Sequence, residues 1–349
     1  MIQMTVKNNE NEHCGSCAWA NCHNVYHPGR REVYMNDLIR EIENADSIAI
    51  TGHINPDGDC IGSTLGMYNY ITSNYPDKRV QVYLQEFPDV FMFLNGASTV
   101  KHEADDETYD LFMSLDCGDM DRFTPFVRYY ETAKRTLCID HHVSNKGFGD
   151  VCYVESDACS AAEAIFKLLD EKKINQQCAE CLYTGIVHDT GVFKHSNTTR
   201  ESMTIAGILI EKGARPSFVI DETFYKKTLT QNKLLGYALL NMKQFADGKI
   251  THTLLTKEDF DRFGASKMDT DGIVDQLRLT SGTEVAFFMY QAGEDNYKIS
   301  LRANDIVNVS EIACSHGGGG HVKAAGCNMS GDPEKIVAEI VADIEKQLG

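Results

Sequence analysis

The sequence has no long hydrophobic run and comparatively little positive charge. No apolar stretch approaches the roughly 18–20 residues that a membrane-spanning helix needs, and the polar start of the chain does not resemble a secretory signal. We therefore predict a cytoplasmic protein without a membrane partner. Lys and Arg number 33 against 51 Asp and Glu, so the formal net charge is −18. Because a protein that binds long nucleic acid usually presents an extended basic face, this charge argues against long duplex nucleic acid as a partner.

The cysteines do not form a regular framework. Twelve of them are scattered along the 349 residues, and in a cytoplasmic protein such cysteines are expected to be free thiols rather than disulfides. Hydrophobic residues make up 42% of the chain, which is enough for buried cores. The length suits two domains of roughly 100–200 residues each.

Strands that alternate with helices predict an α/β domain with a mostly parallel sheet and helices on both faces. The predicted strands are 47–53, 79–84, 110–116 and 135–140, and the predicted helices are 35–45, 61–72, 160–173 and 177–187. A different pattern begins near residue 228. It predicts a smaller second α/β domain with strands at 249–256, 283–291 and 297–304 and a helix at 333–347.

This pattern divides the chain into four parts. They are an N-terminal extension (1–35), a catalytic metal-binding domain (36–215), a linker (216–227) and a substrate-binding domain (228–349). The extension is rich in metal-ligating residue types, namely Cys14, Cys17, Cys22, His23 and His27. Two interpretations of it stay open, a zinc knuckle and a disordered tail. The second C-x2-C pair, Cys178 and Cys181, has apolar neighbours on a predicted helix, and we interpret it as core.

Acidic and histidine residues gather in four segments, three of which follow predicted strands. The segments are GHINPDGDCIGS (52–63), SLDCGDMDR (114–122), IDHHVSN (139–145) and GIVHDTGVF (185–193). Ligands of open α/β sheets bind beyond the carboxyl ends of the strands, so we expect these segments to lie together. Carboxylates suit hard divalent cations, and histidine shifts the preference toward Mn²⁺ or a similar ion. Taken alone, each segment also has a structural interpretation, such as Asp59 as a helix cap. We interpret Cys60, Cys117 and Cys138 as small core residues.

The second domain carries a glycine-rich segment, GGGGHVKAAG (317–326), after the strand that ends in Arg302. Glycines let the backbone approach a phosphate, and no Gly-Lys-Ser/Thr follows, so this is not a Walker A loop. Arg302 can hold a phosphate through two hydrogen bonds, and His321 lies beside the expected anion. For Arg278 and Lys323, an anion contact and a solvated surface charge both stay open. For Phe193, base stacking and core packing stay open.

The four segments, H-x3-D-x-D, then D, D-H-H and D-T-G, resemble the metal-binding motifs of the DHH phosphoesterase family over about residues 36–215. The segments SLRAND (300–305) and GGGGHVKAAG resemble the DHHA1 domain over about 228–349. The resemblance implies a phosphohydrolase with two Mn²⁺ ions that activate a water molecule. By that resemblance one ion takes His53, Asp57 and Asp116, and the other takes Asp59, Asp116, His141 and Asp189. Asp140 then supports the histidines, and His142 faces the scissile phosphate.

In the second domain the resemblance implies substrate contacts from Arg302, Gly318, Gly319, Gly320, His321 and Arg278, with His321 also acting in catalysis. Within the family the chain resembles the NrnA-type enzymes, which degrade very short RNA and remove the 3′-phosphate from 3′-phosphoadenosine 5′-phosphate (pAp). Short RNA oligonucleotides or nucleotide bisphosphates are thus the expected substrates, with both domains closing over them, and a homodimer stays open.

The alternatives are hydrolysis of cyclic di-AMP or its linear product pApA, a RecJ-like exonuclease, a family II pyrophosphatase and a nucleotide sensor without catalysis. RecJ-like enzymes are larger, and the pyrophosphatases carry a different second domain. The sensor is disfavoured because all the expected ligands are present.

Overall fold

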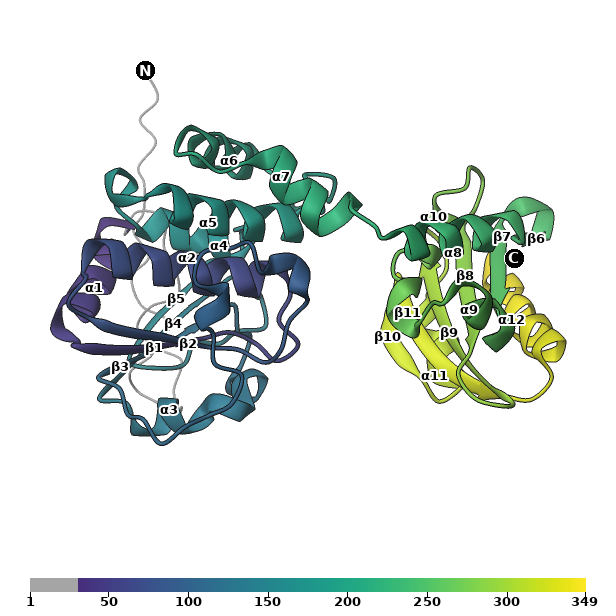
Figure 1. Ribbon diagram of the computed structural model, residues 1–349, viewed down its shortest axis with the longest axis horizontal. Helices are drawn as coiled ribbons and strands as arrows, with labels where there is room; N and C mark the ends of the chain where they lie inside the picture. Colours follow the sequence, from purple (N-terminus) through teal and green to yellow (C-terminus); the bar gives the residue numbers. More distant parts are fainter. Residues whose placement is uncertain (1–30) are drawn as a thin grey trace, which may run out of the picture. The chain divides into compact units, whose positions relative to one another are not determined.

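The computed structural model describes residues 31–349, which form two compact units. The chain passes from the first unit to the second between Lys226 and Lys227 (Figure 1). The candidate zinc ligands between Cys14 and His27 lie outside the described residues. Within the described part, no helix combines the length and the apolar character needed to cross a membrane.

The first unit is built around a five-stranded sheet with the order β2-β1-β3-β4-β5, in which all neighbouring strands are parallel. The strands are β1 (Ser47–Thr51), β2 (Arg79–Tyr83), β3 (Leu111–Leu115), β4 (Arg135–Asp140) and β5 (Val151–Val154). The predicted parallel sheet is thus confirmed. Strand β5 is absent from the sequence prediction because its four residues are too few for a recognisable alternation.

Helices cover both faces of this sheet, as predicted (Figure 1). The larger core lies on the face covered by α1 (Arg31–Asn44), α2 (Gly58–Asn74), α4 (Ala161–Leu168) and α5 (Gln176–Asp189). Beside these helices lie α6 (Arg200–Glu211), α7 (Pro216–Ile220) and a π-helical turn (Asp221–Tyr225). Aromatic side chains of η4 (Met120–Phe126) and α3 (Val127–Thr132) pack on the opposite face. Single 3₁₀ turns occur at η2 (Asp89–Phe91), η3 (Ala97–Thr99) and η5 (Glu171–Lys173).

Several boundaries differ from the expectation; for example, the helix predicted at 160–173 ends at Leu168 as α4. Helix α2 begins at Gly58 rather than near Ile61, because Asp57 caps it by accepting hydrogen bonds from the backbone N–H groups of Asp59 and Cys60. Asp59 is therefore inside the helix and is not its cap. Most of the expected linker, 216–227, is helical and belongs to the first unit.

Helices α2 and α5 approach each other closely through glycines. A methyl group at Gly62 would lie 2.5 Å from the carbonyl oxygen of Cys181 and 2.6 Å from the backbone nitrogen of Gly185. Cys178 and Cys181 are fully buried on α5, so their interpretation as core residues is confirmed. Because the two helices almost touch, Asp59 near the start of α2 is held close to the end of α5.

The second unit is a smaller α/β domain around a mixed sheet with the order β10-β11-β9-β8-β7-β6, where only β7 and β8 are parallel. Its strands are β6 (Lys243–Phe245), β7 (Ile250–Leu255), β8 (Val285–Gln291), β9 (Asn296–Ala303), β10 (Gly319–His321) and β11 (Ala324–Ser330). Its helices are α8 (Leu229–Leu240), η7 (Ala246–Gly248), α9 (Lys257–Phe263), η8 (Lys267–Thr270), α10 (Ile273–Arg278), α11 (Val309–Ser315) and α12 (Pro333–Leu348). The expected Gly-rich loop is in fact a hairpin of β10 and β11.

The two faces of this second sheet have different roles. Side chains from Val285, Phe287 and Ile299 form the larger core together with α11 and α12. The other face packs on α8 and α10 through Ala286 and Phe288. Arg302 is paired in register with Ala286, so its side chain leaves the sheet on the face that α10 covers.

Candidate functional site

His53 and Asp57 lie in the loop that joins β1 to α2. The Nδ1 atom of His53 donates a hydrogen bond to the carbonyl oxygen of Ile54 at 2.9 Å. Its Nε2 atom lies 3.6 Å from Oδ1 of Asp57 and 3.4 Å from Oδ2 of Asp116. The backbone contact fixes the ring so that Nε2 is directed at the two carboxylates.

Asp116 directly follows β3 and is buried, with 2% of its surface exposed. Its backbone is left-handed, with φ at 57°, and its N–H donates to the carbonyl oxygen of Ile139 at 3.0 Å. Its Oδ1 atom is buried without a hydrogen-bond partner. Because a buried carboxylate oxygen without a partner is costly, this atom marks a place where a cation would be favourable.

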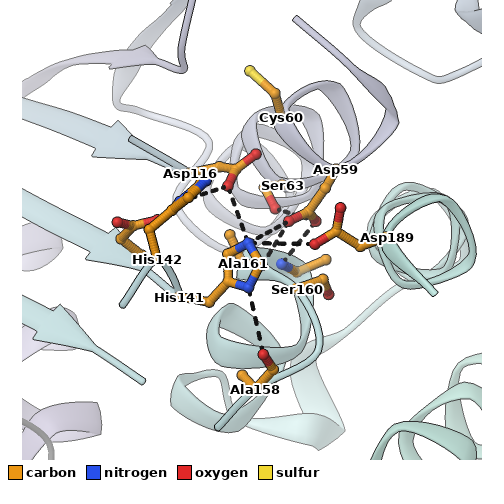
Figure 2. Close-up of polar contacts among 12 residues, drawn as sticks. Asp59, Cys60, Ser63, Asp116, His141, His142, Ala158, Ser160, Ala161 and Asp189 are labelled. Atoms are coloured by element: carbon orange, nitrogen blue, oxygen red, sulfur yellow. Dashed lines mark hydrogen bonds and ion pairs between the residues drawn. The ribbon is translucent and has the colours of Figure 1, made fainter. Parts of the chain in front are cut away.

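His141 lies at the centre of the carboxylates, as Figure 2 shows. Its Nε2 atom is 3.3 Å from Asp189, 3.5 Å from Asp116 and 3.9 Å from Asp59. Its Nδ1 atom is 3.4 Å from the carbonyl oxygen of Ala158. As with His53, the Nδ1 contact leaves Nε2 facing the acidic side chains, which is the arrangement of a metal-ligating histidine.

Asp59 is held by the start of α4. Its carboxylate accepts hydrogen bonds from the backbone N–H groups of Ala161 at 2.6 Å and Ala162 at 3.1 Å. The Ser63 hydroxyl, one turn along α2, also donates to it at 3.1 Å. These contacts orient the side chain (Figure 2). Both carboxylate oxygens keep further lone pairs for a cation.

His142 is oriented by a chain of hydrogen bonds that runs through the buried Asp140 to Asn145. Its Nδ1 atom lies 2.7 Å from Oδ1 of Asp140, whose Oδ2 accepts a hydrogen bond from Asn145 at 2.7 Å. Asp140 is fully buried, whereas the His142 side chain is 43% exposed. The ring is thus fixed at Nδ1, and its Nε2 atom has no partner among the described residues.

The charges of this cluster shift one another's pKa values. Burial disfavours the imidazolium form of His53 and His141, but the surrounding carboxylates outweigh it and raise each pKa to about 10. Burial raises the pKa of Asp189 to about 6, although His141 opposes the shift. Burial acts on Asp116 in the same sense, but the two histidines outweigh it and hold its pKa below the usual range. The protonated histidines thus neutralise part of the negative charge of the carboxylates. A bound divalent cation would do the same.

These donor sets fit a divalent metal. Three groups have ligand atoms within 4.8 Å of one another, and they are Asp59/His141/Asp189, Asp116/His141/His142 and His53/Cys60/Asp116. Five of the six predicted ligands belong to these groups. Asp57 belongs to none of them, and its side chain is 61% exposed, although its Oδ1 atom lies 3.6 Å from Nε2 of His53. Cys60, Cys117 and Cys138 are buried, as expected for core residues, and Cys60 also reaches the edge of the cluster.

In the second unit Arg302 and His321 belong to one row of the sheet. Arg302 pairs with Ala324 on β11, and Ala324 pairs with His321 on β10. Residues paired in register point to the same face, and two strand spacings separate the outer pair by roughly 10 Å. The small Ala324 side chain leaves the space between the two polar ones open.

Besides their predicted role of letting the backbone approach a phosphate, two glycines of the hairpin are required by close packing. A methyl group at Gly318 would lie 2.2 Å from the carbonyl oxygen of Gly326, and one at Gly320 would lie 2.5 Å from that of Ala324. Gly319 has open space around it. The N–H of Gly318 already donates to the carbonyl oxygen of Ala313, so this N–H group is not free to bind an anion.

Arg278, Lys323 and Phe193, whose roles the sequence left open, each contact other parts of the protein. Arg278 donates from Nη1 to Oδ1 of Asn304 at 2.7 Å, and Lys323 donates to the carbonyl oxygen of Asp305 at 2.6 Å. Phe193 packs against the first core, and its ring is tilted by 56° to that of Tyr183 with 6.4 Å between the ring centroids. Arg278 and Phe193 are partly buried, whereas Lys323 is exposed.

The sequence prediction misses several residues that hold the site together. Asn145 supports Asp140, and Asn304 supports Arg278. Asp275 lies within 4 Å of both Arg278 and Arg302. For Asn145, its place in the segment after the two histidines is a usable signal. Asn304 has the same kind of signal, because it lies in the SLRAND segment two residues after Arg302. Asp275 carries no such signal, because only the packing of α10 on the sheet brings it to the arginines.

The geometry agrees with two family models. Residues 47–186 match the DHH family, N-terminal domain, and residues 247–349 match the DHHA1 domain. The chain contains a DHH domain and a DHHA1 domain. The DHH match includes the segments of His53, Asp116 and His141 and ends shortly before Asp189. The DHHA1 match includes Arg302 and the β10–β11 hairpin.

Two curated relatives and one solved structure are similar to most of this chain. The chain is 28% identical to the "Bifunctional oligoribonuclease and PAP phosphatase NrnA" of Bacillus subtilis, over 88% of this chain and 97% of the relative. It is 25% identical to the "Cyclic-di-AMP phosphodiesterase PdeA" of Listeria monocytogenes, over 91% of this chain and 49% of the relative. The crystal structure of an exopolyphosphatase-related protein from Bacteroides fragilis superposes with a TM-score of 0.77 at 27% identity, over 90% of this chain and 96% of that one.

Proposed function

We propose that this DHH/DHHA1 chain is a metal-dependent phosphoesterase that hydrolyses very short oligoribonucleotides and pAp. The observation that carries the proposal is the buried Oδ1 atom of Asp116, which has no hydrogen-bond partner and faces His141 at 3.5 Å. The similarity to NrnA-type relatives over most of the chain supports the substrate class. The hydrolysis of phosphate esters is the activity common to these relatives.

Two Mn²⁺ ions are the proposed cofactors. His53, Asp57 and Asp116 would hold one ion, and Asp59, Asp116, His141 and Asp189 the other. Bound divalent ions would supply a hydroxide at neutral pH and neutralise charge on the phosphate. The backbone contacts of His53 Nδ1 and His141 Nδ1 support this assignment, because they leave both Nε2 atoms for ligation.

The remaining residues of the site would bind and orient the substrate. His142 would donate a hydrogen bond from Nε2 to an oxygen of the scissile phosphate, and Asp140 keeps the ring in place at Nδ1. Arg302 and His321 of the DHHA1 domain would bind a second phosphate group or the end of the chain being cut. Their common row on one sheet face supports this role.

A substrate panel with Mn²⁺ tests the proposal. The panel contains pAp, pApA, cyclic di-AMP, RNA oligomers of about two to five nucleotides, and a labelled RNA of about 24 nucleotides in one buffer. We expect kcat/KM to be highest for pAp or the shortest RNAs and to fall steeply with length. The chain carries −18 formal charge, so a long polyanion gains little along its surface.

Three results would point elsewhere. A higher kcat/KM for cyclic di-AMP than for pAp and short RNA would favour the activity named for the Listeria relative. Equal or faster degradation of the long RNA would indicate an exonuclease with an open channel. Absence of any turnover of the panel, and of bis-p-nitrophenyl phosphate, with saturating Mn²⁺ would favour a nucleotide sensor.

A further inference from the structure

Asp275 of α10 lies between the two arginines of the DHHA1 domain. Its Oδ1 atom is 3.4 Å from Nε of Arg302 and 3.8 Å from Nε of Arg278. The same carboxylate oxygen thus forms an ion pair with both guanidinium groups. Neither arginine forms another ion pair within the described part of the chain.

Each guanidinium also has a second contact that fixes its other side. Nη1 of Arg302 donates to the carbonyl oxygen of Leu301 at 3.1 Å, and Nη1 of Arg278 donates to Oδ1 of Asn304 at 2.7 Å. Asn304 in turn donates to the carbonyl oxygen of Thr283 at 2.7 Å. Two contacts on different atoms hold a planar group in one orientation. In both arginines the Nη2 atom has no partner within the described part of the chain.

The side chains involved remain accessible. Arg302 is 31% exposed and Asp275 is 44% exposed, so this is a surface arrangement and not part of a core. Arg302 lies in the same sheet row as His321, with only Ala324 between them. The free edge of the Arg302 guanidinium is therefore on the sheet face that also carries His321.

A carboxylate at this place has two opposite effects on an anion. It repels a phosphate by its charge, and it lowers the freedom of the two guanidinium groups that would bind the phosphate. Two arginines held this close would also repel each other, and the shared carboxylate offsets that repulsion. Isolated surface ion pairs contribute little to the free energy of unfolding. If Asp275 only stabilised the fold, replacing it would therefore change that free energy very little.

We propose that Asp275 is a positioning residue for substrate binding. Its carboxylate holds Arg302 and Arg278 side by side, so that their free N–H groups bind one phosphate group of a nucleotide. This inference rests on the proposed function, because it concerns the domain that would bind the end of the substrate away from the metal centre. If Asp275 acted only by its charge, removing the carboxylate would lower KM, because it repels a phosphate. The positioning role predicts instead that removing it raises KM.

The test compares Asp275→Asn, Asp275→Ala and Asp275→Glu with the wild type. We expect the Asn and Ala variants to raise KM for pAp about tenfold, since one hydrogen bond to a charged group has roughly that effect. Asp275→Glu retains the charge and should restore part of the loss. We expect kcat, Mn²⁺ content and turnover of bis-p-nitrophenyl phosphate to stay within about twofold of the wild type, because this small diester has no second phosphate.

A mutant cycle and a charge control complete the test. In a background with both Arg302→Ala and Arg278→Ala, Asp275→Ala should raise KM no further, because the residue acts through these two arginines. Glu339→Gln removes an exposed negative charge from α12 of the same domain and should leave KM for pAp unchanged. Thermal unfolding of each variant separates a folding defect from a binding defect.

The outcomes are distinct. An unchanged or lower KM for pAp in a folded Asp275→Asn protein would overturn the positioning role alone and would mean that the carboxylate acts only by its charge. A wild-type chain that neither binds nor hydrolyses any nucleotide of the panel would overturn this inference together with the proposed function.

Discussion

The Nε2 atom of His141 lies 3.5 Å from Oδ1 of Asp116, a buried oxygen that has no hydrogen bond. His53 faces the other oxygen of the same carboxylate at 3.4 Å. Asp116 therefore separates two histidines and offers one oxygen to each side. This is the arrangement required of a ligand that two metal ions share.

Replacing Asp116 tests the metal centre. We expect Asp116→Asn to lose most Mn²⁺ binding and nearly all turnover, because one neutral amide cannot bridge two cations. Changes in supporting residues typically cost 10–100-fold, and a shared ligand should cost more. Asn tolerates the left-handed backbone at this position, so the fold should persist. Calorimetric titration with Mn²⁺ and the rate with bis-p-nitrophenyl phosphate are the measurements.

The matched control for this variant is Asp121→Asn, which changes an exposed carboxylate in the same segment. It should bind Mn²⁺ and turn over substrate as the wild type does. Near-normal activity of a folded Asp116→Asn protein at saturating Mn²⁺ would exclude the shared-ligand model.

The hydrogen bond between His142 and Asp140 predicts a variant that loses activity but keeps its Mn²⁺, unlike Asp116→Asn. Asp140→Asn weakens the 2.7 Å contact that orients the ring but removes no proposed metal ligand. We expect kcat to fall about 10–100-fold while Mn²⁺ content stays unchanged. Steady-state kinetics together with metal analysis of the purified protein check this. A parallel loss of Mn²⁺ would show instead that Asp140 or His142 belongs to the metal ligands.

His252 predicts a pH dependence of stability in the second unit. It is buried on β7 with its ring stacked on Phe287 at 4.3 Å, and burial lowers its pKa to about 4. In the unfolded chain a histidine has a pKa of about 6.5. As the pH falls from about 6.5 to about 4, the unfolded chain gains a proton that the folded chain does not, so stability decreases, by at most about 3 kcal/mol.

This effect is measured by urea unfolding of the wild type and of His252→Gln between about pH 7 and about pH 4.5. Other groups titrate in both proteins, so the difference between their two pH profiles reports His252. We expect the wild type to lose more stability than the variant across this range. Parallel profiles would contradict the prediction.

Two glycines predict opposite effects of the same substitution. Gly62→Ala places a methyl group against the backbone of α5, at 2.5 Å and 2.6 Å from its nearest atoms, and backbone atoms cannot easily move aside. We expect a loss of about 1–3 kcal/mol and reduced activity, because Asp59 lies on the same helix.

Gly207 on α6 is the matched position, because a methyl group there meets no atom within 4 Å. We expect Gly207→Ala to gain about 0.5–1 kcal/mol, since alanine loses less backbone entropy in a helix. The two melting temperatures should move in opposite directions relative to the wild type. A stabilised Gly62→Ala protein would show that α2 and α5 can separate at little cost.

The sequence by itself determined the fold class and indicated which acidic and histidine residues would lie close together. His53, Asp116 and His141 each lie just past the end of a parallel strand, and such ends meet at one edge of the sheet. The order of strands and loops along the chain was therefore enough to predict that these three residues lie close together. The second domain was recognisable in the same way from its strand pattern and its glycine-rich segment.

Only the tertiary structure decided which atoms of these residues are available. The unpartnered oxygen of Asp116, the N–H groups that hold Asp59 and the carboxylate of Asp275 between two arginines all depend on contacts between separate elements. The hairpin geometry likewise showed that Gly318 and Gly320 are required by close packing. Hydrogen bonds and ion pairs act over a few ångströms, and the sequence pattern fixes elements but not the distances between their side chains.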